Sequence, residues 1–165
     1  MFKKLVVTLS IVVASLGFTS VVFADDSVKN DIVEVVLENG SLKTFGEALK
    51  TANLVDTLKS EGPFTVFAPT DKAFANLPEG TLETLLEPEN KSKLTAILSY
   101  HIVKSKLTGN DIVKATSFET SQGQKLTVST AGGRVMINNA GVSMIDVKAS
   151  NGVIHVIDTV LMPKE

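Results

Sequence analysis

The 165-residue sequence contains no cysteine and no tryptophan, and it has only two histidines and one tyrosine. Without cysteine the chain can form no disulfide, no thiolate metal site and no cysteine nucleophile. The shortage of large aromatic rings leaves little material for a platform on which sugars or bases could stack. Chemistry that depends on imidazole is restricted to His101 and His155. These absences exclude several classes of enzyme and redox protein before any motif is considered.

The chain also lacks an excess of basic residues. It has 16 Lys and Arg against 18 Asp and Glu, which gives a net charge of -2 at pH 7. Proteins that bind nucleic acid neutralise phosphates with a basic face, and this composition supplies no surplus for one. With 44% hydrophobic and 21% charged residues, the chain can bury a core, and its length suits one domain. We therefore predict a single folded domain that does not bind nucleic acid.

The first 24 residues differ from the rest of the sequence. Lys3 and Lys4 precede an apolar run over residues 5–18 that contains no acidic residue, and Ala24 precedes Asp25. This order of charged, apolar and small residues is typical of a secretory signal peptide. The alternative is an uncleaved membrane anchor, but a transmembrane helix needs roughly 20 apolar residues. We predict a signal peptide at 1–24 and a secreted domain, periplasmic or extracellular, at 25–165, with no transmembrane span after cleavage.

Helical periodicity dominates the first half of the predicted domain. Asp31 and Glu34 have the spacing that begins a short helix, and Asn39 precedes a glycine that would end it. Thr44 and Glu47 have the spacing of a capping box at the start of a second helix. The apolar stripe of this helix consists of Leu42, Phe45, Leu49 and Ala52. A longer helix is predicted from residue 90, and its apolar face consists of Leu94, Ile97, Leu98 and His101.

Strand patterns dominate the second half. Residues 63–69 form a short apolar run between two prolines, which predicts a buried strand followed by a helix capped by Thr70 or Asp71. After Gly109 apolar residues recur at every second position, which predicts antiparallel strands joined by hairpins. The alternating pairs are Leu126 with Val128, Val135 with Ile137, and Val142 with Met144. Residues 153–161 are apolar on both faces, which predicts a central strand covered on both sides. Helices followed by strands favour an α+β fold.

The two histidines fall on predicted apolar faces. Strand periodicity places His155 and Asp158 on opposite faces, so a local His-Asp relay is excluded in a regular strand. We interpret His101 and His155 as buried imidazoles that form hydrogen bonds with backbone or hydroxyl groups. The alternative is that one of them contacts a ligand, for example a small apolar molecule or cofactor in a cleft near His101 or His155.

Motifs of the common enzyme classes are absent from the sequence. It carries no HExxH, GxSxG, P-loop or dinucleotide-binding glycine pattern. The acidic residues near the start of the domain lack the spacing of calcium ligands. An enzyme would need a polar constellation from distant segments, such as Tyr100, His101 and an acid. We predict no catalytic residue, no cofactor and no metal site.

Three segments closely resemble those of the fasciclin-like domain family. They are Phe64 to Phe74, reading FTVFAPTDKAF; Leu98 to Val103, reading LSYHIV; and Ala149 to Pro163, reading ASNGVIHVIDTVLMP. The resemblance covers nearly all of residues 27–163. It implies a wedge-shaped β-sandwich of about seven strands with helices packed around it. The signature positions are Phe64, Thr65, Phe67, Pro69, Asp71, Asn151, Gly152, His155 and Asp158.

The same resemblance implies a role in adhesion or partner binding. In animal members of the family, a Tyr-His region and an Asp-Ile pair are implicated in integrin binding; here they correspond to Tyr100-His101 and Asp146-Val147. Valine replaces isoleucine in the second pair, so the natural partner of this chain is expected to differ. The expected partner is a protein or polysaccharide outside the cytoplasm. If His101 faces inward, as its periodicity indicates, the motif supports a binding surface from below.

Overall fold

The computed structural model describes residues 29–60 and 62–164, so the predicted signal peptide lies outside the described residues. The helices are α1 (Ile32–Glu38), α2 (Lys43–Thr51), α3 (Val55–Lys59), α4 (Asp71–Ala75), α5 (Thr81–Leu86), the 3₁₀ helix η2 (Pro88–Asn90), α6 (Lys91–Tyr100) and α7 (Gly109–Lys114). The strands are β1 (Phe64–Pro69), β2 (Ile102–Val103), β3 (Ser117–Glu119), β4 (Lys125–Ala131), β5 (Arg134–Ile137), β6 (Ala140–Ala149) and β7 (Gly152–Ile157).

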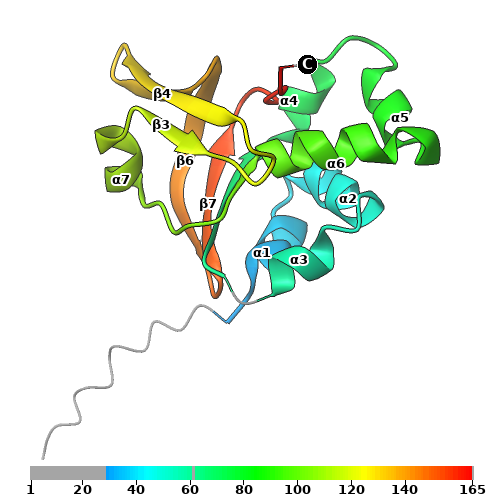
Figure 1. Cartoon of the computed structure of the whole chain (residues 1–165), viewed down its shortest axis with the longest axis horizontal. Coiled ribbons are helices and arrows are strands. Elements are labelled where there is room, and N and C mark those ends of the chain that lie inside the picture. Colours follow the sequence, from blue (N-terminus) through cyan, green and yellow to red (C-terminus); the bar gives the residue numbers. More distant parts are fainter. Residues whose placement is uncertain (1–28, 61, 165) are drawn as a thin grey trace, which may run out of the picture.

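The strands form one seven-stranded sheet in the order β2-β1-β7-β6-β5-β4-β3. β1 and β7 run parallel, and the other neighbouring pairs are antiparallel. Beyond β3, the N–H of Ser121 donates to the carbonyl of Ile102 at 2.7 Å, so the chain after one edge strand reaches the other edge. The sheet is thereby nearly closed into a barrel. The helices α1 to α6 lie together on one side of it (Figure 1).

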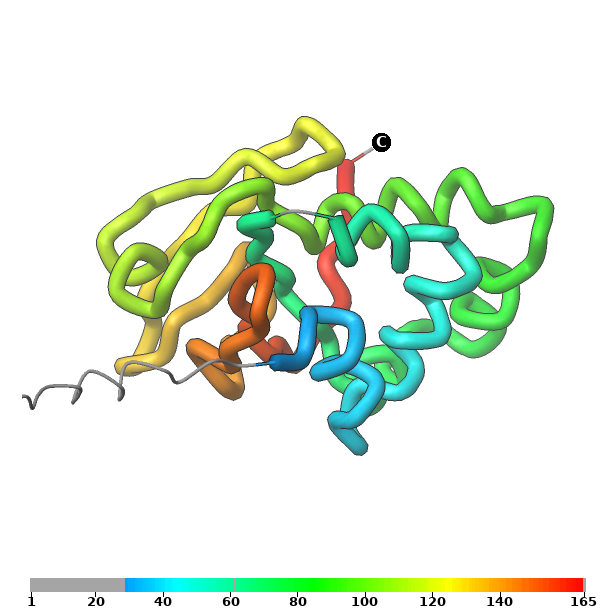
Figure 2. Tube along the Cα trace, turned by 90° about the horizontal axis from the view of Figure 1, so that it is seen from below, coloured from blue at the N-terminus to red at the C-terminus, as the bar shows by residue number. Residues whose placement is uncertain are grey.

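Two hydrophobic clusters fill this arrangement. One lies between the helices and the adjacent face of β1 and β7, and it includes Phe45, Val66 and Ile154. The other lies inside the curled sheet and includes Phe67 and Ile157. Both strands are therefore buried on both faces, as the sequence predicts for the two apolar runs. The tube view shows the two strands passing between the helices and the remaining strands (Figure 2). The predicted α+β class, with about seven strands and helices packed around them, is confirmed, and the strands of the expected β-sandwich form a single nearly closed sheet.

Helix starts show where local sequence signals hold and where they fail. Asp31 caps α1 in a complete capping box with Glu34, and Thr70 caps α4, as predicted. The predicted capping box of Thr44 and Glu47 is wrong, because the N-cap of α2 is Leu42, two residues earlier, and no side chain bonds there. The N–H of Thr44 instead donates to Oδ1 of Asp71 at 2.8 Å. The carboxylate of Asp71, at the start of α4, therefore takes the role of the local cap. Only the folded chain brings Asp71 next to Thr44.

The segment between residues 102 and 119 departs from the predicted strand pattern. α7 occupies Gly109–Lys114, immediately where a period of two was expected to begin. Its signal is a capping box formed by Thr108 and Asp111, whose side chains and backbone N–H groups bond reciprocally. The short strands β2 and β3 were also not predicted, since two or three residues are too few for a readable period.

β6 contains two irregularities that reverse the direction of its side chains. The pairing with β7 shifts between Val142 and Met144, and again between Met144 and Val147. An extra residue on one strand moves every following side chain to the other face. Val142 is therefore buried as predicted, whereas the predicted inward position of Met144 is wrong: 52% of its surface is exposed.

β1 and β7 approach each other so closely at one end that only glycine fits. A Cβ atom added to Gly152 would lie 2.0 Å from the carbonyl oxygen of Phe64 and 2.8 Å from Cδ1 of Ile32. Gly152 therefore serves the packing of the parallel pair as well as the turn that leads into β7.

Candidate functional site

His101 is completely buried at the end of α6, where it is the C-cap residue. Its Nδ1 donates to the carbonyl of Ile97 at 2.8 Å, and its Nε2 accepts from the N–H of Leu161 at 3.0 Å. Burial lowers the pKa of His101 to about 4, although the bond to Ile97 opposes this shift. The ring is neutral at pH 7 and joins α6 to the C-terminal segment of the described chain.

Tyr100 is also buried, with 3% of its surface exposed. Its hydroxyl donates to the carbonyl of Lys125 at 3.3 Å and accepts from Nδ2 of Asn138 at 2.9 Å. Asn138 in turn accepts from the N–H of Thr127 at 2.8 Å. The phenol thus joins the end of α6 to β4 and to the turn after β5. Tyr100 and His101 both point inward, so any contribution they make to a partner acts through the surface above them.

His155 is buried on the face of β7 that lies inside the curled sheet. Its Nε2 donates to the carbonyl of Leu107 at 2.7 Å, and its Nδ1 accepts from the N–H of Asp146 at 3.2 Å. The ring stacks on Phe67 with centroids 5.6 Å apart. Burial lowers its pKa, opposed by the bond to Leu107 and by the charge of Asp146. Both histidines are thus buried and bonded to backbone groups, as the sequence predicts.

Thr65, His155 and Asp146 together hold the loop at residues 105–109. The hydroxyl of Thr65 donates to the carbonyl of Ser105 at 2.6 Å and accepts from the N–H of Leu107 at 2.8 Å. Oδ1 of Asp146 accepts from the N–H of Gly109 at 2.7 Å. With the bond from His155 to Leu107, three side chains from three strands fix the loop and the start of α7. The sequence identified these three residues separately, but nothing in it placed them around one loop.

The remaining signature positions have structural contacts. Asn151 accepts from the N–H of Ile32 at 3.0 Å and donates to the carbonyl of Leu58, which fastens α1 and α3 to the start of β7. Asp158 accepts from the N–H of Gly141 at 2.9 Å. Since β7 ends at Ile157 and both nitrogens of His155 bond to other groups, His155 and Asp158 form no relay. Phe64 and Pro69 are buried in β1.

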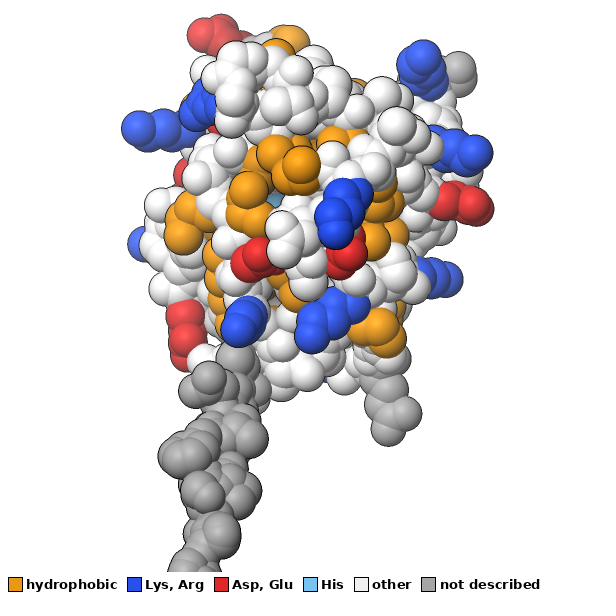
Figure 3. All heavy atoms as spheres, turned by 90° about the vertical axis from the view of Figure 1, so that its left-hand side faces the viewer, with side chains coloured by type: hydrophobic (Ala, Val, Ile, Leu, Met, Phe, Trp, Pro, Cys, Tyr) orange, Lys and Arg blue, Asp and Glu red, His pale blue; other side chains and the backbone are white. Residues whose placement is uncertain are grey.

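A hydrophobic patch lies on the outer surface beside Asp146, and we call it the α7-β6 patch. It consists of Val113 of α7, which is 56% exposed, and Met144 and Ile145 of β6, which are 52% and 44% exposed. The space-filling view of this side shows hydrophobic side chains near the centre of the face with acidic and basic side chains around them (Figure 3). The sequence did not indicate this patch, because the irregular register of β6 decides which of its side chains face outward.

Asp146 connects this patch to the buried polar groups. Its φ of 59° lies in the left-handed region, which aspartate tolerates better than most residues. Its N–H bonds to His155 and its carboxylate to Gly109. Val147, the other half of the predicted Asp-Val pair, is half-buried and packs against the cluster beneath the helices. The role of Tyr100, His101, Asp146 and Val147 in partner binding stays a prediction.

The described ranges hold neither a metal-binding cluster nor a membrane-spanning helix. Residues 29–60 and 62–164 contain no group of three or more His, Asp or Glu side chains placed to hold a metal ion. In the same ranges, none of the helices combines the length and the apolar character needed to cross a membrane.

Comparison with known proteins gives consistent matches. Residues 40–163 match the family model of the fasciclin domain. Protein sll1483 of Synechocystis is 52% identical over 132 residues, which cover 80% of this chain and 73% of that protein. The transforming growth factor-beta-induced protein ig-h3 of Sus scrofa is 37% identical over 132 residues, which cover 80% of this chain and 19% of that protein.

Among solved structures, a FAS1 domain pair from the insect cell adhesion molecule fasciclin I superposes with a TM-score of 0.72. The superposition covers 81% of this chain and 51% of that chain, with 21% sequence identity. This chain therefore spans about half of that solved structure, and the two share their fold. None of these names refers to an enzymatic reaction.

Proposed function

The chain belongs to the fasciclin domain family, and from this premise we propose that it is a secreted interaction module without enzymatic activity. It binds a protein outside the cytoplasm through the α7-β6 patch. The observation that carries this proposal is the exposure of Val113, Met144 and Ile145, with Ile145 lying against Gly109 at the start of the helix that carries Val113. Exposed apolar side chains surrounded by polar residues are typical of protein contact sites, which have an apolar centre and a polar rim.

The backbone beneath the patch supports this role because it is held in place. Asp146 lies between the loop at 105–109 and β7, and its two hydrogen bonds hold the neighbouring Ile145 at the surface. A surface ordered before binding loses less conformational entropy when a partner docks. Met144 adds a flexible side chain that can adapt to the partner's shape. The patch therefore combines a fixed backbone with an adaptable apolar contact.

The buried members of the signature fit the same proposal. His155 and Thr65 position the loop that leads into α7, and α7 carries Val113. The signature residues then act as positioning residues beneath the binding face. The lack of a free imidazole nitrogen at either histidine also agrees with recognition, because each ring nitrogen already bonds to a backbone group.

A capture experiment with matched variants tests the proposal. The protein, immobilised, is exposed to the exported proteins and glycans of its host, and the captured species are quantified by mass spectrometry. We expect a protein whose enrichment falls at least tenfold with the double variant Val113→Gln and Met144→Gln. The control Leu37→Gln, at an exposed apolar residue of α1, should change it less than twofold. Enrichment of glycans alone, or equal enrichment of the captured protein by the double variant and by the Leu37→Gln control, would contradict the proposal.

Export is tested independently of the partner. We expect the amino terminus of the accumulated protein to be Asp25, because cleavage after Ala24 fits the charged, apolar and small residues before it. Terminal peptide mass spectrometry on culture medium, periplasm and membrane fractions measures this. Recovery of the chain with residues 1–24 still attached, in the membrane fraction, would support the anchor instead.

A further inference from the structure

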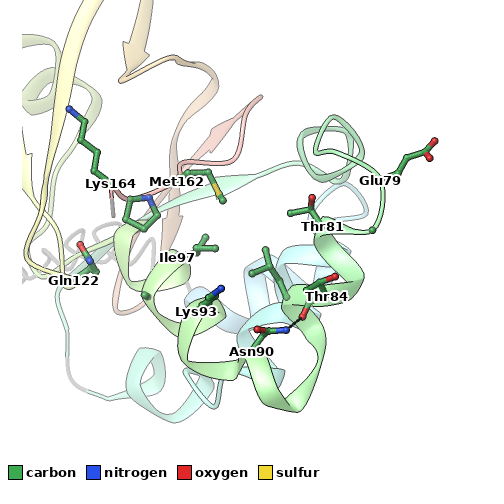
Figure 4. A pocket seen from close by; sticks show the side chains of 13 residues that line it. Glu79, Thr81, Thr84, Asn90, Lys93, Ile97, Gln122, Met162 and Lys164 are labelled. Atoms are coloured by element: carbon green, nitrogen blue, oxygen red, sulfur yellow. Dashed lines mark hydrogen bonds between the residues drawn. The ribbon is translucent and has the colours of Figure 1, made fainter.

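A hollow of about 620 Å³ lies on the opposite side of the molecule from the α7-β6 patch, between α5, α6 and the segment at residues 162–164. It is distinct from the surface to which the proposed function is assigned, and none of the signature residues lines it. Figure 4 shows Met162 approaching Ile97 across it, with Thr81 and Thr84 on the wall formed by α5. Its size falls in the range of small-molecule sites, about 300 to 1,000 Å³.

Apolar side chains form the base of the hollow. Leu85 of α5 and Ile97 of α6 are almost fully buried, and Met162, which is 49% exposed, lines the hollow from the C-terminal segment. Such a base favours the apolar body of a ligand because each buried methylene stabilises the complex by about 0.8 kcal/mol.

The charged residues that line the hollow are Glu79, Lys93 and Lys164, and they point in different directions (Figure 4). Lys93 projects from α6 beside the hollow, whereas Glu79 and Lys164 extend away from it (Figure 4). The ion pairs among residues 29–60 and 62–164 join Lys59 to Asp31 and Arg134 to Asp158, so no carboxylate of the described chain pairs with Lys93. An anionic group beside the apolar base would therefore meet an unpaired ammonium.

Three hydrogen-bonded contacts hold the walls in position. Nδ2 of Asn90 donates to the carbonyl of Thr84 at 2.8 Å, which joins the ends of α5 and α6. The side chain of Gln124 bonds to both the N–H and the carbonyl of Lys164, at 2.9 and 2.6 Å. The third contact is the imidazole of His101, which bonds to Ile97 and to Leu161 next to Met162.

The third contact connects His101 to two backbone segments beside the hollow. Ile97 and Met162 both line the hollow, and His101 links the backbone of Ile97 to the backbone of Leu161, next to Met162. His101 does not reach the hollow itself, since it is fully buried. Its effect on the hollow is limited to holding the backbone of Ile97 and of Leu161.

We propose that the hollow between α5, α6 and residues 162–164 binds a small amphipathic carboxylate, with its apolar body on Leu85, Ile97 and Met162 and its carboxylate at Lys93. Shape, apolar base and unpaired cation agree on this class. A neutral apolar molecule would leave the ammonium unused, and a strongly polar anion would leave the apolar base uncovered.

The probes that test this proposal are decanoate and decan-1-ol, which share a chain length and differ in charge. Titration into the protein labelled at its methyl groups reports binding through methyl chemical shifts. We expect saturable shifts at Leu85, Ile97 and Met162 with decanoate, and at least tenfold weaker binding of decan-1-ol. The double variant at Val113 and Met144 should bind decanoate as the unaltered protein does, which separates this test from that of the proposed function.

Matched variants test whether decanoate binding depends on the charge of Lys93 and on the open volume of the hollow. Lys93→Gln should weaken decanoate binding at least tenfold, whereas Lys50→Gln, at an exposed lysine of α2, should change it less than twofold. Ala96→Leu fills the hollow from α6 and should abolish binding of both probes while thermal unfolding stays within a few degrees. Equal affinity for the two probes, indifference to Lys93→Gln, or shifts centred elsewhere would overturn the proposal. Absence of saturable shifts at millimolar decanoate would overturn it as well.

Discussion

Acidification should destabilise the fold through His101, because protonation of its ring cannot be accommodated where the ring lies. In the folded chain Nδ1 donates to one carbonyl and Nε2 accepts from one N–H. A proton on Nε2 would face the N–H of Leu161, and the charge would be buried without a partner. In the unfolded chain the same ring is solvated and takes up a proton near its ordinary pKa of 6.5.

The size and direction of the effect follow from the two pKa values. Below about pH 6.5 the unfolded state binds the proton and the folded state does not, so stability falls as the pH decreases. The loss continues until the pH reaches the folded pKa of about 4. At about 1.4 kcal/mol per pKa unit, this difference amounts to about 3 kcal/mol lost between pH 7 and pH 4. His155 shifts in the same direction and adds to the loss.

The assay compares urea unfolding of the natural chain and of His101→Phe at several values of pH between 7 and 4. The variant should be less stable at pH 7, by about 2 to 4 kcal/mol, because the N–H of Leu161 and the carbonyl of Ile97 lose their partner. Its stability should also fall less on acidification. The difference between the two profiles isolates His101 from His155 and from the carboxylates.

Imidazole nitrogen NMR provides a direct check, since the chain has only two histidines. The hydrogen-bond partners assign the proton to Nδ1 in His101 and to Nε2 in His155. The two rings should therefore give opposite tautomer patterns at pH 7. A His101 that titrates near 6.5 in the folded protein, or parallel stability profiles for the two chains, would refute the reasoning.

Substitutions at three positions test the packing and the loop contacts. Phe67→Ala should lower the free energy of unfolding by about 3 to 5 kcal/mol, because it empties a fully buried site stacked on a histidine; a loss below about 1 kcal/mol in thermal unfolding would contradict that placement. Asp146→Ala should lower the free energy of unfolding by about 1 to 2 kcal/mol and speed amide exchange at Gly109. Asp146→Asn keeps an acceptor oxygen and should change both quantities far less. Gly152→Ala should lower the free energy of unfolding by more than about 3 kcal/mol or prevent folding, because the added methyl group would overlap the carbonyl of Phe64. Urea unfolding at nearly the same concentration as the natural chain would contradict this and show that β1 and β7 can move apart.

The candidate site could be predicted only in part from the sequence. Periodicity placed His101 and His155 in the interior, because burial of a helix stripe or a double-faced strand leaves a repeating pattern. The same reasoning put Met144 inside, since an extra residue in a strand leaves no mark on the alternation before it. It also missed α7, where a capping box of Thr108 and Asp111 was the available signal.

Local order thus set the types of the main elements, the two buried strands and the interior placement of both imidazoles, because these depend on the spacing of apolar residues along the chain. Tertiary structure alone decided which groups meet: Asp71 with Thr44, Asp146 with Gly109, and the walls of the hollow beside Lys93. Such contacts depend on register, bulges and the closing of the sheet. Those features are set by the packing of segments distant in the sequence, which no spacing within one segment encodes.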